Sequence, residues 1–325
     1  MRILITGGTG FVGSVLLHSL GAGSQRQLVA ATRTETTSAA PGVTYIDVGD
    51  LGRSIDWRPA LSGVDVVVHL AARVHVMRDT VPDPLPEFRR VNVEATLDLA
   101  RQAAAAGTRR FVFVSSIKVN GESTPPGRPF RSDDEDAPCD PYGMSKQEAE
   151  QGLYALAAQT GMTVLTIRPP LVYGPGVRAN FLRLMALVDR GIPLPLGGVE
   201  NARSLVSVWN LCDLIRAAVD APSLRSGVLL VSDGEDLSTP DLMRRMAKFM
   251  GRPARLFALP VPVLKTLARL AGKTEELSRL CDSLTVDIAT TRQALNWSPP
   301  MSVDESLHST VQWYLRQHRA NSRAQ

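Results

Sequence analysis

Residue types that mark membrane, metal-binding or disulfide-stabilised proteins are scarce in this sequence. Its 325 residues include only three cysteines, Cys139, Cys212 and Cys281, which lie far apart and are odd in number. A disulfide framework needs paired cysteines, so we expect reduced thiols. The five histidines show no metal-ligand spacing, which predicts that the protein binds no metal. No apolar run reaches the ~18 residues that a membrane-spanning helix requires.

A strong net charge is also missing. The formal net charge is only +4, and much of the excess lies near the C-terminus, in Arg316, Arg319 and Arg323. We interpret these arginines as a solvated helix end, so no nucleic-acid partner is expected. Near the N-terminus, Ile3 to Ile5 leads straight into a glycine turn, without the longer apolar stretch of a signal peptide. A cytoplasmic protein without an integral membrane segment is therefore predicted.

A glycine-rich loop follows the first apolar run. Arg2 to Thr6 has the composition of a buried strand, and a helical pattern of leucines begins after the loop. Strand, loop and helix in this order are typical of a dinucleotide-binding fold. Gly7 permits the tight turn, Gly10 lets the backbone approach a pyrophosphate, and Gly13 lets helix and strand pack closely. We therefore predict a dinucleotide cofactor at this loop.

The end of the second predicted strand, Gln27 to Thr32, indicates which dinucleotide is bound. NAD sites usually place an acidic residue there to hold the ribose 2′-hydroxyl. Here that place holds Arg33, whose guanidinium suits the 2′-phosphate of NADP. Glu35 lies close by in the sequence, so NADP is preferred and NAD remains the alternative.

Further apolar segments predict the rest of a parallel sheet. Strands that are apolar almost throughout, and therefore buried, are expected within residues 43–48, 64–72, 110–116 and 162–167. One long helix is expected from Pro86 to Ala106, and it carries Asn92. Ligands bind beyond the carboxyl ends of the strands in such a sheet. Ser115 and Ser116 end one of these strands, so we expect them to face a substrate.

Tyr142 and Lys146 lie four residues apart, so they share one face of a helix that begins at Pro141. Free tyrosine has a pKa of about 10 and is a poor base at neutral pH. A nearby ammonium group favours the phenolate and lowers this pKa. We therefore expect Tyr142 to exchange a proton with a sugar or alcohol hydroxyl.

Together these features resemble the extended short-chain dehydrogenases/reductases. The motifs that carry the resemblance are the glycine loop, His69-Leu70-Ala71-Ala72, Asn92, Ser115-Ser116 and Tyr142-x-x-x-Lys146. Within this family the chain is similar to the NAD-dependent epimerases and dehydratases of nucleotide sugars, typified by UDP-glucose 4-epimerase. Segments 115–121 and 168–175 most resemble bacterial enzymes of surface-polysaccharide synthesis that act at C4 of UDP-N-acetyl-hexosamines, including reductases of their 4-keto-6-deoxy forms.

The resemblance assigns roles to individual residues. It implies that Tyr142 is the acid/base at the sugar O4, that Lys146 holds the nicotinamide ribose, and that Ser116 hydrogen-bonds O4 or the developing carbonyl. Hydride would pass between C4 of the sugar and the nicotinamide. Besides Tyr142 and Lys146, the implied cofactor contacts are Gly7, Gly10, Phe11, Val12, Gly13, Arg33, Asp50, Leu51, Leu70, Ala71, Ala72, Asn92 and Pro169. The implied contacts of a UDP-sugar substrate are Ser116, Lys118, Asn180, Arg203 and Arg279.

Several activities share these residues. The 4,6-dehydratases carry Thr-Asp-Glu where this chain has Ser116-Ile117-Lys118, so a dehydratase is not expected. The leading hypothesis is a 4-ketoreductase of a UDP-4-keto-6-deoxy-N-acetylhexosamine, because Arg33 favours an exchangeable NADPH. A UDP-N-acetylglucosamine or UDP-glucose 4-epimerase is the first alternative. A reductase of lipophilic ketones and a non-catalytic NAD(P)-sensing module are further alternatives, opposed by Arg203 and by the retained Tyr142 and Lys146, respectively.

The predicted fold is α/β, with a Rossmann-type doubly wound parallel sheet and a smaller C-terminal substrate-binding α/β domain. Residues 1–175 are expected to form the dinucleotide-binding domain and 176–325 mainly the substrate domain, with some segments returning to the first. Residues 261–280 have helical apolar spacing with interleaved basic residues. A helix packed on the substrate domain is preferred there to one on a membrane surface. By resemblance, we expect a homodimer formed through the helices of Asn92 and Tyr142.

Overall fold

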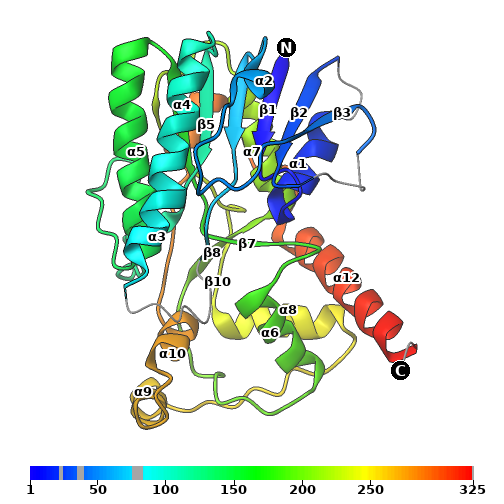
Figure 1. Ribbon diagram of the computed structural model, residues 1–325. Helices are drawn as coiled ribbons and strands as arrows, with labels where there is room; N and C mark the ends of the chain where they lie inside the picture. The colour runs from blue at the N-terminus through cyan, green and yellow to red at the C-terminus, as the bar shows by residue number, and fades with distance from the viewer. Residues whose placement is uncertain (22–24, 35–39, 75–82, 324–325) are drawn as a thin grey trace.

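The computed structural model describes residues 1–21, 25–34, 40–74 and 83–323, and side chains up to residue 317. A seven-stranded sheet forms the upper part of the molecule (Figure 1). Its order is β3-β2-β1-β4-β5-β6-β9, and every neighbouring pair is parallel. The strands are β1 (Arg2–Thr6), β2 (Gln27–Thr32), β3 (Val43–Asp47), β4 (Val66–His69), β5 (Arg110–Val114), β6 (Thr163–Arg168) and β9 (Gly227–Leu230). This order confirms the predicted Rossmann-type fold.

Both faces of the sheet are covered by helices, because successive side chains along each buried strand point to opposite sides. On one face, strand residues such as Ile3 and Val68 pack with α1 (Phe11–Gly21) and α7 (Val208–Asp220). On the other face, Leu4, Val67 and Phe111 lie in a second core. The helices on that side are α2 (Arg58–Leu61), α4 (Ala95–Ala105) and α5 (Pro141–Thr160). The carboxyl ends of the strands therefore remain the open edge for a ligand.

The predicted long helix from Pro86 to Ala106 is present as a continuous helical segment, but its middle turn is π-helical. The chain forms α3 (Leu85–Arg89), then a π-helical turn η1 (Arg90–Glu94), and then α4. Asn92 lies in this π-helical turn. It is buried and hydrogen-bonded to groups outside its own helix. Such π-helical turns occur frequently at functional sites.

The lower lobe contains a small sheet in the order β10-β8-β7. Its strands are β7 (Leu171–Tyr173), β8 (Arg203–Ser207) and β10 (Asp236–Leu237), and its helices include α6 (Ala179–Asp189), α8 (Thr239–Phe249) and α12 (Val303–Arg323). A separate hydrophobic core joins Tyr173, Phe181 and Met243 with the inner face of α12. Between these segments the chain returns to the upper sheet through α7 and β9, and α11 (Ala289–Leu295) packs against β9.

Residues 261–280 form two helices rather than one. Helix α9 (Val261–Leu270) ends at a turn, and α10 (Thr274–Cys281) follows it. Gly272 in this turn has a φ of 65°, a left-handed conformation that glycine adopts without the cost of a Cβ. The expectation of a continuous helix is therefore wrong. None of the helices in the described part of the chain is long and apolar enough to cross a membrane.

Candidate active site

Helix α5 begins with a well-formed N-terminal cap beyond the carboxyl edge of the sheet. Asp140 has extended backbone angles, and its Oδ1 accepts a hydrogen bond of 2.7 Å from the Gly143 amide. Pro141 occupies the first turn, where its missing N–H costs nothing. A Cβ at Gly143 would lie 2.9 Å from the Lys118 carbonyl oxygen, so only glycine permits this close approach. The cap thus fixes where Tyr142 is presented.

Lys146 is buried beneath Tyr142. Its Nζ donates to the Val114 carbonyl at 2.9 Å and lies 4.4 Å from the centre of the Phe113 ring. Burial lowers the pKa of Lys146 to about 7, although the nearby Glu150 carboxylate opposes the shift. An ammonium has further N–H donors, and Val114 is its only hydrogen-bond acceptor among the described residues. Lys146 can therefore donate to a ligand that enters at this edge.

The Tyr142 ring is half-buried and meets Phe88 edge-on, with 6.1 Å between the ring centres. Lys146 Nζ lies 5.9 Å from the centre of the Tyr142 ring. Burial, and then the Asp140 carboxylate, raise the pKa of Tyr142 above its ordinary value. The expected lowering of the Tyr142 pKa by Lys146 is therefore absent. Desolvation of the phenolate raises this pKa by more than the distant Lys146 ammonium lowers it.

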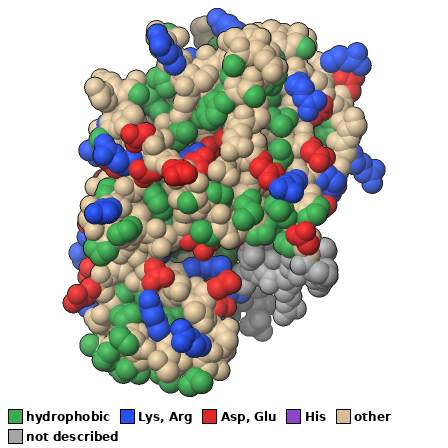
Figure 2. Space-filling model, turned by 90° about the vertical axis from the view of Figure 1, so that its left-hand side faces the viewer, with side chains coloured by type: hydrophobic (Ala, Val, Ile, Leu, Met, Phe, Trp, Pro, Cys, Tyr) green, Lys and Arg blue, Asp and Glu red, His purple; other side chains and the backbone are tan. Residues whose placement is uncertain are grey.

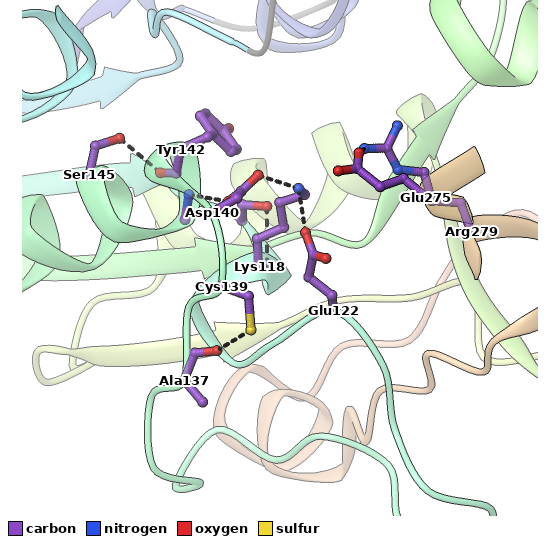
Figure 3. Close-up of polar contacts among 11 residues, drawn as sticks. Lys118, Glu122, Ala137, Cys139, Asp140, Tyr142, Ser145, Glu275 and Arg279 are labelled. Carbon is purple, nitrogen blue, oxygen red and sulfur yellow. Dashed lines mark hydrogen bonds and ion pairs between the residues drawn. The ribbon is translucent and has the colours of Figure 1, made fainter. Parts of the chain in front are cut away.

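Lys118 lies in the short 3-10 turn η2 (Ile117–Val119), which follows β5, and Ser116 directly precedes this turn. The Ser116 hydroxyl caps this turn by accepting from the Lys118 amide at 3.3 Å. Lys118, expected from the family resemblance to contact substrate, forms ion pairs with Asp140 and with Glu122, the latter at 2.8 Å (Figure 3). Its charge is therefore matched by carboxylates of the protein, one of which caps the helix of Tyr142.

A buried ion network lies behind the same segments. The guanidinium of Arg168, at the end of β6, pairs with Glu150 on α5 and with Asp136 at 2.8 Å. It also donates to the Asn120 side-chain oxygen at 2.9 Å. These contacts join β6, α5 and the chain that follows η2, so they hold Ser116 and Tyr142 in fixed relation. No local pattern marks Arg168 or Glu150 as part of the site, whereas Asp140, an aspartate before proline, is a recognisable helix cap.

Asn92 connects the loop after β4 to the catalytic helix. Its Nδ2 donates to Ser145 Oγ and to the Arg73 carbonyl, each at 3.0 Å, and its Oδ1 accepts from the Arg73 amide at 2.8 Å. Both polar atoms of the Asn92 side chain are thus hydrogen-bonded to other groups of the protein. Asn92 can act on a cofactor by positioning this loop, which begins with Ala71 and Ala72.

The glycine loop has the shape that a dinucleotide requires. Gly7 has a φ of 69°, and a Cβ there would lie 2.9 Å from the Ala71 amide nitrogen. A Cβ at Gly13 would lie only 2.1 Å from the Gly7 carbonyl oxygen. The loop therefore packs against the end of β4 and opens at the N-terminus of α1, where Phe11 and Val12 begin the helix. Free amides and the helix dipole favour a pyrophosphate at such a position, so the residues present fit the predicted cofactor.

The other expected cofactor residues follow neighbouring strands. Arg33 is exposed directly after β2, and Asp50 and Leu51 follow β3, with Asp50 Oδ1 accepting from the Gly52 amide at 2.9 Å. Leu70 follows β4. Pro169 follows β6, and its carbonyl accepts from the Ile117 amide at 3.0 Å. All of them lie at the carboxyl edge of the sheet, while Glu35 lies outside the described residues.

The expected substrate residues of the lower lobe differ in their surroundings. Arg203 begins β8 and is half-buried, and its Nη1 donates to the Asp282 carbonyl at 2.9 Å. Burial lowers its pKa, against the opposing effect of Asp282. Asn180 is exposed in the first turn of α6. Arg279 is exposed on α10 and pairs with Glu275 at 3.3 Å (Figure 3). Arg203 is thus the best anchored of these groups.

Comparison with known proteins agrees with this geometry. Residues 3–228 match the NAD dependent epimerase/dehydratase family. The chain is 45% identical over 322 residues to a UDP-glucose 4-epimerase of Vibrio cholerae, covering 99% of this chain and 97% of that protein. It is 26% identical to an N-acetyl-alpha-D-glucosaminyl-diphospho-ditrans,octacis-undecaprenol 4-epimerase of Escherichia coli O157:H7, covering 96% and 95% of the two chains. Among solved structures it is similar to MoeE5 in complex with UDP-glucuronic acid and NAD, with a TM-score of 0.77, 28% identity and coverage of 98% and 100%.

Proposed function

Because the chain belongs to the NAD-dependent epimerase/dehydratase family, we propose that it is an NAD-dependent 4-epimerase of a UDP-sugar. The observation that carries this proposal is the placement of Tyr142 with the buried Lys146 Nζ 5.9 Å from its ring centre, beside a glycine loop shaped for a dinucleotide. The similarity to the Vibrio cholerae epimerase, which extends over nearly the whole chain, supports the same activity. NAD is accordingly preferred to the NADP that Arg33 indicates.

Each catalytic residue has a defined task in this proposal. Tyr142 removes the proton from the sugar O4 and later returns it, while the Ser116 hydroxyl hydrogen-bonds the same oxygen. NAD held at the glycine loop would supply the acceptor and donor for the hydride of C4. Lys146 donates to the ribose of the cofactor and adds the positive charge that the Tyr142 phenolate requires.

Inversion at C4 also restricts how the sugar is held. A cofactor held in one orientation would accept and return the hydride on the same side of the site, so the sugar would have to turn over between the two transfers. Tight binding of the UDP moiety would allow the sugar to rotate, whereas tight binding of the sugar ring would prevent this rotation. Arg203 suits the diphosphate because its guanidinium is anchored to the Asp282 carbonyl and keeps further donors for phosphate oxygens.

A 4-ketoreductase of a UDP-4-keto-6-deoxy-N-acetylhexosamine is the second candidate function. The exposed Arg33 after β2 favours it, because that position suits a 2′-phosphate and hence an exchangeable NADPH. The two activities share Ser116, Tyr142 and Lys146. They differ in whether the cofactor leaves after one hydride transfer.

Identification of the bound nucleotide separates the two activities. We expect NAD to be released when the purified protein is denatured, and UDP-glucose or UDP-N-acetylglucosamine to be inverted at C4 without added cofactor. Rapid oxidation of NADPH with UDP-4-keto-6-deoxy-N-acetylglucosamine, in a protein purified without nucleotide, would favour the reductase instead. A parallel assay with NADH tests the role of Arg33.

Assembly and location complete the proposal. We propose a homodimer formed through the helical segment η1–α4, which carries Asn92, and through α5, which carries Tyr142, and a cytoplasmic location where UDP-sugars are available. Residues 1–175 would hold mainly the cofactor and 176–325 mainly the sugar nucleotide. Light scattering of the purified protein tests the dimer, and a monomeric mass would contradict it.

A further inference from the structure

Helix α9 lies at the lower end of the molecule, at the tip of the lobe opposite the large sheet (Figure 1). Leu264 is the only residue of this helix that is buried. Three large apolar side chains of α9 are exposed: Val263 at 43%, Leu267 at 54% and Leu270 at 82%. Their spacing of four and three residues places them on one face of the helix. An apolar face of this kind marks an interaction site.

Basic residues predominate around this face, and the exposed acidic residues nearest to it, Glu275 and Glu276, lie on the neighbouring helix α10. Residues 251–273 contain no aspartate or glutamate, and their basic residues are Arg252, Arg255, Lys265, Arg269 and Lys273. Lys265 lies 3.5 Å from the Asp282 carboxylate, and Arg252 lies 3.1 Å from Asp189. Arg269 and Lys273 form no ion pair with any described residue and are exposed. Figure 2 shows hydrophobic side chains gathered at the lower tip of the molecule, with both basic and acidic side chains above them.

We propose that the exposed face of α9 docks on the surface of an anionic lipid bilayer. Val263, Leu267 and Leu270 would enter the boundary between headgroups and acyl chains, and the flanking basic residues would contact lipid phosphates. Phe257, which is 50% exposed just before α9, adds an aromatic side chain of the type found at such boundaries. The helix has ten residues and is too short to span the bilayer, so it lies on the surface.

Charge favours a bilayer over a second copy of the chain as the occupant. In a two-fold dimer through α9, the same patch would face itself, so Lys265 and Arg269 of the two copies would lie close together. Segment 251–273 has five basic residues and no acidic one, and Glu275 and Glu276 on α10 only partly offset this repulsion. An anionic bilayer complements both the apolar stripe and the basic flank.

The docking face is linked to the substrate side of the active site. Helix α10 follows α9, and at its end the Asp282 carbonyl accepts from Arg203 and the Ser283 carbonyl accepts from the Thr124 amide at 2.8 Å. Thr124 lies just beyond Lys118 and Glu122. A docked α9 would therefore hold the proposed diphosphate site close to the membrane surface. None of the residues of the docking face belongs to the catalytic set, so the test does not depend on the proposed activity.

Sedimentation with lipid vesicles tests the proposal on the full chain. We expect the protein to sediment with vesicles that contain phosphatidylglycerol but not with pure phosphatidylcholine, and added salt should weaken the binding. Leu267→Ser with Leu270→Ser should lower the partition coefficient about tenfold or more. Lys265→Gln with Arg269→Gln should lower it about fivefold for each charge removed. Arg53→Gln with Arg58→Gln, an equal charge change on the upper lobe, is the matched control and should bind as the unchanged protein does.

Two results would contradict the docking of α9 on a bilayer. The proposal fails if the unchanged protein stays in the supernatant with anionic vesicles, or if the α9 variants sediment as it does. A change in the mass of the α9 variants by light scattering would show that the face joins protein chains instead. Circular dichroism spectra and urea unfolding curves should be the same in all variants, which confirms that they are folded.

Discussion

The ammonium of Lys118 pairs with the carboxylate of Asp140, and Asp140 caps the helix that carries Tyr142. The Asp140 charge raises the pKa of Tyr142, so the ion pair partly neutralises a group that opposes formation of the phenolate. Lys118 is therefore connected to the catalytic tyrosine through the helix cap. The structure therefore indicates a positioning role for Lys118, whereas the family resemblance implies a contact with the substrate.

Replacement of Lys118 by methionine tests that role. The Asp140 charge would then be uncompensated, so the pKa of Tyr142 should rise further and less phenolate should be present at neutral pH. We expect kcat to fall about tenfold near neutrality and to recover as the pH is raised. Lys118→Arg, which keeps the charge, is the control. A higher KM with an unmoved pH profile of kcat would instead show that Lys118 contacts the substrate.

Replacement of Asn92 by alanine should destabilise the fold. The buried amide makes hydrogen bonds to Ser145 and to both backbone groups of Arg73, and alanine leaves these partners unsatisfied. We expect the free energy of unfolding to fall by about 3 kcal/mol in urea titrations. The exposed Asn180→Ala should change it by less than about 0.5 kcal/mol. Equal stability of the two variants would contradict the structural role of Asn92.

His69 predicts how the stability depends on pH. It is buried between Thr6 and Thr96, and burial lowers its pKa from 6.5 to about 3. Below pH 6.5 the unfolded chain therefore binds a proton that the folded protein does not, so stability falls as the pH falls. Between about pH 6 and about pH 5 this effect approaches 1.4 kcal/mol. Lys146 adds no slope here, because its folded pKa of about 7 and its ordinary 10.5 both lie above this window.

His69→Gln supplies the comparison for this effect. Glutamine can donate and accept hydrogen bonds but does not titrate. Its free energy of unfolding should fall less steeply over the same pH interval than that of the unchanged protein. Parallel slopes would show that His69 is not the group responsible.

Arg203→Ala tests the proposed diphosphate contact. Loss of a charge-assisted hydrogen bond to phosphate should raise the Kd of the sugar nucleotide about tenfold to a hundredfold, with NAD binding unchanged. Arg279→Ala should have a smaller effect, because Arg279 is exposed and paired with Glu275. Arg216→Ala, on the upper lobe, should have none. Unaltered UDP-sugar affinity in Arg203→Ala, measured by calorimetry, would remove this residue from the site.

Local sequence patterns predicted the sheet well because buried parallel strands are continuous apolar runs. The bounds of β1 and β2 follow the predicted residues Arg2 to Thr6 and Gln27 to Thr32 without change. The π-helical turn at Asn92 could not be predicted in this way, because Asn92 bonds to Ser145, 53 residues away in the sequence. The Lys118–Asp140 pair is likewise a contact between distant segments.

Other features of the structure do have a local signal in the sequence. Gly272 lies inside the predicted helix 261–280 and marks the turn between α9 and α10. Asp140 before Pro141 is the pattern of a helix cap. The pKa of Tyr142, by contrast, depends on how deeply the surrounding fold buries its ring. The spacing of Tyr142 and Lys146 in the sequence does not predict this burial.

The most direct measurement of the central claim is the fate of a UDP-sugar mixed with the purified protein and no added cofactor. We expect UDP-glucose or UDP-N-acetylglucosamine to convert to its C4 epimer, followed by NMR, until both epimers are present at equilibrium. Tyr142→Phe should slow this conversion by orders of magnitude with nucleotide still bound, whereas Tyr154→Phe, on the same helix, should not. Absence of any C4 inversion by a protein that holds NAD, or near-normal turnover by Tyr142→Phe, would contradict the proposed epimerase.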